Sequence, residues 1–386
     1  MSLPKHLPAL DGLRAMAVTL VIASHAFPMV HELPWTVKRF SNLGWYGVQL
    51  FFVVSCVTLA NSWRRQELTG PPSLRGFALR RWFRIAPAYF IAALGYLWLM
   101  QPAAIDATRV ATFLTFTSGW SPAQMPTVQN AWIGVPGGWS IEAEFAFYAI
   151  FPILIVRMRG LRRALVALAI SLPVAWAANS AGLAAYQPAY GDMATDQFLY
   201  YWLPNQIPVF LVGLVTYELI VSLSEEGRWQ RAARGIVRFR VGILAICLVT
   251  FASLAMLPWP RLPEPGHAFL PSHVIAATAF AGACVALTLC PGTIITNRFV
   301  TRLGQASFSA YLIHFAIIAG LERVLPDRIL AGTGVAAALT GGALFLLVLG
   351  LTGCIAQITY RLIETPAIRI GSLVIAGTRS RAIAAI

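Results

Sequence analysis

Three ionisable side chains lie within the first apolar stretch of this sequence. Asp11 and Arg14 stand near its start and His25 near its end. At about 100° per residue, a helix would carry all three on one face, with Arg14 and His25 roughly 16 Å apart along the axis. A histidine can take a proton from a hydroxyl, and an arginine can bind an anion or steady a developing negative charge. The three are candidate catalytic residues. The alternative is an arginine that reaches the membrane surface and a histidine that only packs.

Two carboxylates open a later apolar stretch, in the segment WSIEAE at residues 139–144. On a helix, Glu142 and Glu144 would point about 200° apart, so at most one is expected to share a cavity with His25. A carboxylate beside a histidine could orient it or support it electrostatically. The alternative is that both carboxylates reach interfacial water.

A basic segment, RRWFRIAP at residues 80–87, adjoins another apolar stretch. If this segment is helical, Arg81 and Arg84 share a face and could hold one polyanion. Arginine suits this task because its guanidinium makes forked contacts with phosphate. The alternative is the arginine excess that marks the cytoplasmic side of membrane proteins.

Four further residues are candidates for substrate binding. His314 is a second histidine within an apolar stretch, and Tyr311 precedes it by three positions. Asn205 and Gln206 fall within the proline-flanked segment 203–208, and helices broken by proline often line cavities. For His314, burial as a packing residue is the alternative.

The composition indicates that the elements carrying these residues lie in a bilayer. Of the 386 residues, 58% are hydrophobic and 11% are charged, and the mean hydropathy is +0.69. A soluble domain has about 25% charged residues. Ionisable side chains cost free energy in hydrocarbon, so those named above should face a protein interior or a water-filled path. The five cysteines show no spacing typical of a zinc site or a disulfide framework, and no metal is expected.

The hydrophobic pattern predicts an all-α integral membrane protein with about ten transmembrane helices. We expect one polytopic domain over residues 1–386, without a fused soluble domain. A span needs about 20 mostly apolar residues. The predicted spans are 10–30, 44–63, 85–101, 139–157, 164–181, 199–221, 241–257, 273–290, 307–325 and 333–359. The shorter apolar segment 110–118 is predicted to be re-entrant or interfacial.

Lysine and arginine are distributed unequally between the two predicted sides of the membrane. With the N-terminus in the cytoplasm, all but six of the 29 fall in inside segments, the exceptions being Lys38, Arg39, Arg109, Arg261, Arg323 and Arg328. This asymmetry fits the positive-inside rule and places both termini in the cytoplasm. The net charge of +14 is then explained by topology and contact with anionic lipids, so no nucleic-acid partner is predicted.

Two predicted external loops, 102–138 and 182–198, contain aromatic and short polar side chains. They are Trp120, Gln124, Gln129, Asn130 and Trp132 in the first loop, and Tyr186, Tyr190, Asp192 and Asp196 in the second. Such side chains could bind carbohydrate, where a ring stacks on the apolar face of a sugar. They could equally form an aromatic belt at the membrane surface.

Taken in order, six motifs resemble those of the membrane-bound acyltransferase-3 family, which are polytopic O-acyltransferases of bacterial surface glycans. The motifs are Asp11-Gly12-Leu13-Arg14 with His25, GVQLFFVVS at 47–55, Arg81-x-x-Arg84 with Pro87, Trp139-Ser140-Ile141 with Glu144, SFSAYLIH at 307–314, and YRLIETP at 360–366. The resemblance covers the whole chain. Among the departures, Glu142 occupies a position that is often serine, so Glu144 corresponds to the family's glutamate.

The resemblance implies transfer of an acyl group, most often acetyl, from cytoplasmic acyl-coenzyme A to a sugar hydroxyl of a surface or secreted glycan. The membrane would be the bacterial inner membrane. In this scheme His25 is the general base and Glu144 supports it. Arg14, held by Asp11, contacts the donor or steadies its carbonyl, and Arg81 and Arg84 contact the phosphates of coenzyme A.

A function of a different class stays open at this point. Ten spans, intramembrane ionisable groups and proline-broken helices also fit a transporter or flippase for a lipid-linked sugar or a small metabolite. Against it stand the lack of a visible internal repeat and the basic motif at 80–87, which a phosphorylated donor explains better.

Overall fold

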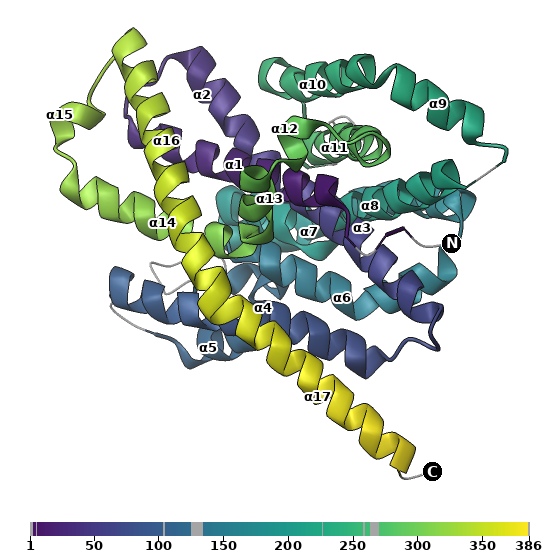
Figure 1. Cartoon of the computed structure of the whole chain (residues 1–386). Helices are drawn as coiled ribbons and strands as arrows, with labels where there is room; N and C mark the ends of the chain where they lie inside the picture. The colour runs from purple at the N-terminus through teal and green to yellow at the C-terminus, as the bar shows by residue number, and fades with distance from the viewer. Residues whose placement is uncertain are drawn as a thin grey trace.

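The computed structural model describes residues 3–4, 6–102, 105–124, 134–225, 227–257, 259–262 and 270–384. This part of the chain forms a bundle of helices, and no strand occurs in it (Figure 1). The predicted all-α fold class is therefore confirmed. The loop residues Gln129, Asn130 and Trp132 lie outside the described ranges.

A helix coincides with each of the ten predicted spans. These helices are α1 (Pro8–Ala26), α3 (Gly47–Glu67), α4 (Leu74–Met100), α6 (Trp139–Arg157), α7 (Leu161–Tyr201), α8 (Leu203–Ser224), α10 (Arg240–Met256), α11 (Ser272–Leu289), α14 (Ser307–Val324) and α16 (Gly334–Thr359). Within the described ranges, eight helical segments are long and apolar enough to cross a membrane, or nine if a bent pair that includes α10 is one span. That count joins α7 and α8 into a single segment of 64 residues, whereas one crossing needs about 20. The number of ten crossings stays a prediction.

Seven further helices connect these elements or extend them. They are α2 (Trp35–Asn42), α5 (Ala107–Leu114), α9 (Gln230–Arg238), α12 (Thr293–Thr296), α13 (Arg298–Gln305), α15 (Asp327–Leu330) and α17 (Thr365–Ala384). The predicted loop at 182–198 is wrong, because α7 continues through it to Tyr201. Its backbone is non-helical only at Gly191, where φ is +76°, and this glycine produces a kink between two helical parts.

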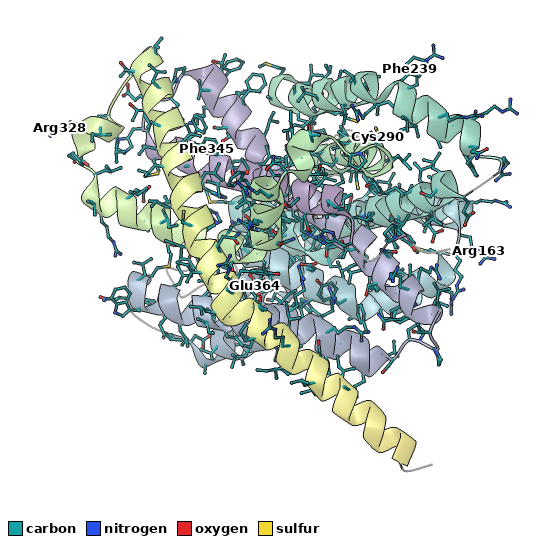
Figure 2. All side chains as sticks on the ribbon, viewed as in Figure 1. Arg163, Phe239, Cys290, Arg328, Phe345 and Glu364 are labelled. Carbon is teal, nitrogen blue, oxygen red and sulfur yellow. The ribbon has the colours of Figure 1, made fainter. Side chains whose placement is uncertain are left out.

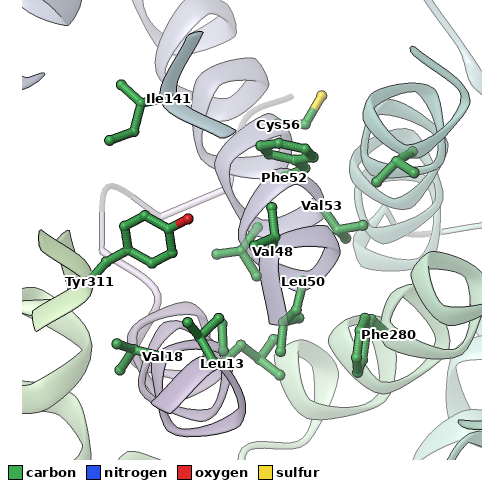
Figure 3. Close-up of a cluster of buried hydrophobic side chains, with 14 of the residues drawn as sticks. Leu13, Val18, Val48, Leu50, Phe52, Val53, Cys56, Ile141, Phe280 and Tyr311 are labelled. Atoms are coloured by element: carbon green, nitrogen blue, oxygen red, sulfur yellow. The ribbon is translucent and has the colours of Figure 1, made fainter. Parts of the chain in front are cut away.

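Helix α1 lies in the middle of the bundle and packs against α3, α13, α14 and α16. Its Leu13 and Val18 are fully buried. In Figure 3 these two side chains belong to the same cluster as Val48 of α3, Ile141 of α6 and Tyr311 of α14. Lipid is as apolar as these side chains, so close packing, and not exclusion from water, holds such helices together.

The start of α1 is fixed by a backbone contact with α13. A Cβ atom built on Gly304 would lie 1.8 Å from the carbonyl oxygen of Asp11. Only glycine permits this approach, and the neighbouring Gln305 donates a hydrogen bond to the Asp11 carboxylate at 3.3 Å. The position of Asp11, and with it the first turn of α1, is therefore set by α13.

The start of α14 is anchored by a carboxylate that is distant in sequence. Helix α16 passes into α17 through a π-helical turn, Tyr360–Glu364, and Glu364 lies where this long helical element crosses the bundle (Figure 2). Its carboxylate accepts hydrogen bonds from the hydroxyl of Ser309 and, at 3.0 Å, from its backbone N–H. A negative charge is favourable at a helix N-terminus. This contact fixes the helix that carries Tyr311 and His314.

Candidate functional site

Two cavities lie along α1. One has a volume of about 690 Å³ and is lined by Arg14, Arg81 and Arg84, and we call it the arginine cavity. The other has a volume of about 510 Å³ and is lined by His25, and we call it the histidine cavity. Arg14 and His25, which are predicted to share one helix face, line different cavities. About 16 Å of helix separates them.

In the arginine cavity, the guanidinium of Arg14 is held by two neighbours. It donates hydrogen bonds of 2.7 Å to the Asp11 carboxylate and 2.7 Å to the Thr58 hydroxyl on α3. Asp11 also accepts a hydrogen bond from His6 at 2.9 Å. The expected contact between Asp11 and Arg14 is therefore present, and Asp11 fixes the arginine without itself reaching far into the cavity, since only 5% of Asp11 is exposed.

Arg81 and Arg84 of α4 line the same cavity, as their spacing predicted. Within the described ranges, Arg84 makes no hydrogen bond or salt bridge, and the buried Nε of Arg81 has no hydrogen-bond partner. Arg84 lies close enough to repel both Arg14 and Arg81, while the carboxylates of Asp11 and Glu144 offset part of this positive charge. The guanidinium of Arg84, which has no hydrogen-bond partner in the described ranges, favours an anionic ligand.

Glu144 lines the arginine cavity and not the histidine cavity. Its carboxylate accepts a hydrogen bond from the Ser55 hydroxyl on α3, and Tyr148 lies beside both Glu144 and Arg81. The expectation that Glu144 supports His25 is therefore not met by any contact in the described structure. The rotation of about 200° between the two glutamates of α6 points Glu144 away from the cavity that holds His25.

In the histidine cavity, one backbone contact determines the tautomer of His25. Its Nδ1 lies 2.8 Å from the carbonyl oxygen of Val21. A carbonyl only accepts, so Nδ1 carries the hydrogen and a neutral His25 keeps its lone pair on Nε2. The ring packs 4.4 Å from that of Phe315, centroid to centroid. His25 is thus prepared to accept a proton at Nε2.

Glu142 is the carboxylate that shares the cavity with His25. It is 7% exposed and accepts a hydrogen bond of 2.6 Å from the backbone N–H of Gly119. Aromatic side chains form much of the remaining wall, namely Trp45, Tyr46, Trp139, Tyr200, Tyr201 and Phe315. The wall also carries polar side chains, among them Gln124, Gln197 and Arg261. A cavity of this size that combines aromatic faces with polar groups is typical of a site for a small organic or sugar ligand.

Three predicted substrate-binding residues do not line either of the two cavities. His314, Asn205 and Gln206 are all 0% exposed. The Nδ1 of His314 donates to the Tyr311 carbonyl at 2.6 Å. Both amides donate to the carbonyl of Tyr200, at 3.2 Å from Asn205 and 2.6 Å from Gln206. These two amides thus satisfy the backbone carbonyl of Tyr200 near the break between α7 and α8. In this way they fix the position of Tyr200, which lines the histidine cavity.

Tyr311 lies at the boundary between the cavities, and it lines both of them together with Val48. Its hydroxyl donates to the carbonyl of Gly137 at 2.8 Å and lies 2.9 Å from the hydroxyl of Ser140. Because Tyr311 reaches both cavities, its predicted place at a substrate site is compatible with the structure.

Sequence reasoning missed several residues of the two walls. Thr58 and Ser55 lie within the predicted second span, and Ser55 ends the motif at 47–55, but their contacts with Arg14 and Glu144 depend on how the helices pack. Tyr200, Tyr201 and Trp45 gave no local signal, because their approach to His25 depends on the packing of α7 and of the segment before α3.

Comparison with known proteins places the chain among acyltransferases. A sequence model of a family described as "Acyltransferase domain" matches residues 7–360. The acyltransferase MdmB of Streptomyces mycarofaciens is 26% identical over 94% of this chain and 92% of its own length. The peptidoglycan O-acetyltransferase OatA of Listeria monocytogenes is 24% identical over 94% of this chain but only 56% of its own length. The chain thus spans little more than half of that relative. No solved structure matches the chain.

Proposed function

The chain belongs to this acyltransferase family. We propose that it transfers an acyl group, namely acetyl, from acyl-coenzyme A to a hydroxyl of a glycan or small glycoside. The observation that carries the proposal is the pair of cavities along α1, which offers one chamber for an anionic donor and another for a hydroxyl-bearing acceptor. The two share a boundary at Val48 and Tyr311, where donor and acceptor would meet.

The donor would occupy the arginine cavity. Coenzyme A carries phosphate groups, and the unpaired guanidinium of Arg84 with the exposed side of Arg81 would contact them. Arg14 would lie against the arm that bears the thioester, held in place by Asp11. Glu144 would act as a positioning residue, because it orders Ser55 and Tyr148 on the wall along which this arm would pass.

The acceptor would occupy the histidine cavity. Its aromatic walls suit the apolar face of a sugar ring, and Glu142 could accept a hydrogen bond from a sugar hydroxyl. His25 would act as general base, taking the proton of the attacking hydroxyl on Nε2 while Val21 holds Nδ1–H. No metal is required for this step.

The proposed sidedness follows from charge. Arginines crowd the end of the bundle that contains the arginine cavity, among them Arg65, and basic residues mark the cytoplasmic side of a membrane. The donor chamber would then open to the cytoplasm, where acyl-coenzyme A is made, and the acceptor chamber to the outside of a bacterial inner membrane.

Purified protein in detergent, given acetyl-coenzyme A labelled in the acetyl group, tests the proposal. We expect release of coenzyme A together with label on an added sugar or glycoside acceptor. Movement of a sugar or metabolite across proteoliposomes without any thioester turnover would instead identify a transporter and overturn the proposal.

A further inference from the structure

Two hydroxyl groups meet at the boundary between the cavities. Tyr311 of α14 and Ser140 of α6 lie 2.9 Å apart, oxygen to oxygen. Both also reach the carbonyl oxygen of Gly137, Tyr311 at 2.8 Å and Ser140 at 3.2 Å. Ser140 lines the arginine cavity, and Tyr311 lines both. This hydroxyl pair therefore faces the point at which a donor in one cavity would come nearest to an acceptor in the other.

Both hydroxyls are hydrogen-bonded within the protein to one shared carbonyl, and the bond from Ser140 is the longer of the two. Each hydroxyl carries one hydrogen, and within the described ranges one carbonyl, that of Gly137, serves both. If Tyr311 keeps its short bond to Gly137, the hydroxyl of Ser140 has only the longer contact to the same carbonyl or the oxygen of Tyr311. A further carbonyl placed at the boundary would give each hydroxyl an acceptor of its own.

We propose that the hydroxyl pair of Tyr311 and Ser140 binds the carbonyl oxygen of the donor thioester and stabilises the negative charge that develops on it. The inference rests on the proposed function and assigns to this pair the role that the sequence had suggested for Arg14. Arg14 lines only the arginine cavity, whereas Tyr311 lines both cavities.

The reaction step balances as follows. The oxygen of the acceptor hydroxyl forms a bond to the thioester carbon while its proton passes to Nε2 of His25. The carbonyl oxygen takes the negative charge and receives the hydrogen bond of the pair. When the carbon–sulfur bond breaks, the carbonyl reforms, and the proton on His25 returns to the departing thiolate of coenzyme A. The products are the ester and free coenzyme A, with no net change in protons.

The fold fixes this pair firmly, as stabilisation of a developing charge requires. Gly137 has a φ of +76°, and a Cβ atom there would lie 2.8 Å from the Tyr311 hydroxyl. Only glycine therefore allows the approach of Tyr311. Glu364 fixes the first turn of α14 two residues before Tyr311 through its bonds to Ser309. Both supports fix the position of the Tyr311 oxygen before any substrate is bound, and its hydrogen would turn from the Gly137 carbonyl to that of the donor.

Steady-state kinetics of Tyr311→Phe tests the inference. Removal of one donor to a developing oxyanion lowers kcat by about 10²–10³-fold, and we expect a loss of this order in Tyr311→Phe. The KM for acetyl-coenzyme A and the Kd of coenzyme A itself, which lacks the carbonyl, should stay unchanged. Ser140→Ala should act in the same direction, and the double variant should lose less than the product of the two single losses, because the two residues act as a unit.

Tyr217→Phe is the matched control. Tyr217 is 1% exposed, lines neither cavity, and its hydroxyl has no hydrogen-bond partner, so this variant should keep the wild-type kcat.

Wild-type kcat in Tyr311→Phe would overturn the inference while leaving the proposed function intact. The inference would also be overturned if Tyr311→Phe lost coenzyme A binding by the same factor as kcat. Such a result would mean that Tyr311 maintains the structure of the donor site and does not stabilise the transition state. Absence of thioester turnover in the wild-type protein would overturn the proposed function and this inference together. If Tyr311→Phe does not fold, as judged by its thermal midpoint in detergent, Ser140→Ala alone decides.

Discussion

At the level of single residues, the protonation pattern of His25 follows from one contact with its own helix. The Val21 carbonyl takes the hydrogen of Nδ1, which leaves Nε2 as the basic atom. The same relation holds for His314 and the Tyr311 carbonyl, but His314 is fully buried behind the cavity wall. Of these two histidines, only His25 lines a cavity.

His25→Ala is expected to lose acyl transfer. A general base contributes about 10²–10⁴-fold to a rate, and kcat with acetyl-coenzyme A and a glycoside acceptor should fall within this range. The measurement is release of coenzyme A by protein that keeps its thermal midpoint. A His25→Ala protein that still binds acetyl-coenzyme A and acylates at the wild-type rate would remove His25 from the mechanism.

Arg84→Ala is expected to weaken the binding of coenzyme A. The guanidinium of Arg84 has no hydrogen-bonding partner in the described structure, so its loss removes a ligand contact without breaking an internal one. A charge-assisted contact is worth about 1.5–3 kcal/mol, which corresponds to a Kd about 10- to 150-fold higher. Arg298→Ala, an exposed arginine of α13, is the control. Equal Kd values for wild type and Arg84→Ala would leave the arginine as a topology signal only.

At the level of elements, α6 divides its two carboxylates between the two cavities. Glu142 faces His25 and the aromatic wall, whereas Glu144 faces Ser55 and the arginines. Helix α14 connects the same two spaces through Tyr311, and its register is fixed by Glu364 from the turn between α16 and α17. The geometry of the site thus depends on the rotation of α6 and the axial position of α14.

Substitution of the two glutamates should separate the two substrates kinetically. Glu142→Gln is expected to raise the KM of the acceptor, since it alters a polar group of the histidine cavity. Glu144→Gln is expected to change the kinetic parameters of acetyl-coenzyme A instead. Each variant is the control for the other, and the measurement is KM for both substrates. The reverse pattern would show that the cavities are assigned to the wrong substrates.

Loss of the α14 anchor should lower stability. Glu364 is 2% exposed and accepts two hydrogen bonds from Ser309, and a buried hydrogen bond to a charged group contributes about 1.5–3 kcal/mol. Glu364→Ala should therefore unfold in detergent at a clearly lower temperature than the wild type. Glu322→Ala, at the exposed end of the same α14, should unfold near the wild-type temperature. Equal midpoints for the two variants would show that the anchor contributes nothing.

At the level of the whole molecule, α1 runs along both cavities, and the remaining helices close them. Helix α17 extends away from the bundle (Figure 1), while α3, α6 and α14 surround the boundary near Tyr311. An enzyme that joins a donor on one side of a membrane to an acceptor on the other needs such a boundary, because an open channel would make the membrane leak.

The orientation of the molecule can be tested with a thiol reagent that does not cross membranes. In a background with the exposed Cys354 replaced by alanine, Thr69→Cys should be labelled only after cells are opened. Thr108→Cys should be labelled in cells whose outer membrane has been permeabilised but whose inner membrane is intact. Both threonines are exposed, so accessibility within the protein does not limit the reaction. The opposite pattern would invert the topology and place the arginine cavity outside.

The sequence by itself determined the class of the protein and the places of its helices. A helix lies at each of the ten segments that hydropathy predicted, because a chain in hydrocarbon must satisfy every backbone group within its own segment. Motif spacing singled out candidate site residues, because ionisable groups are rare in a membrane interior and helical periodicity puts them on defined faces. These candidates are Asp11, Arg14, His25, Arg81 and Arg84.

Only the tertiary structure decided which of these residues meet. The sequence favoured Glu144 as the support of His25 and expected Asn205 and Gln206 to line a cavity. Packing instead turned Glu142 toward His25 and used both amides to satisfy the backbone beside Tyr200. It also brought Tyr311 and Ser140 within hydrogen-bond distance at the boundary. Helical periodicity sets the angles between side chains on one helix, but the direction in which that helix faces is set by contacts with helices remote in sequence, such as those at Gly304 and Glu364.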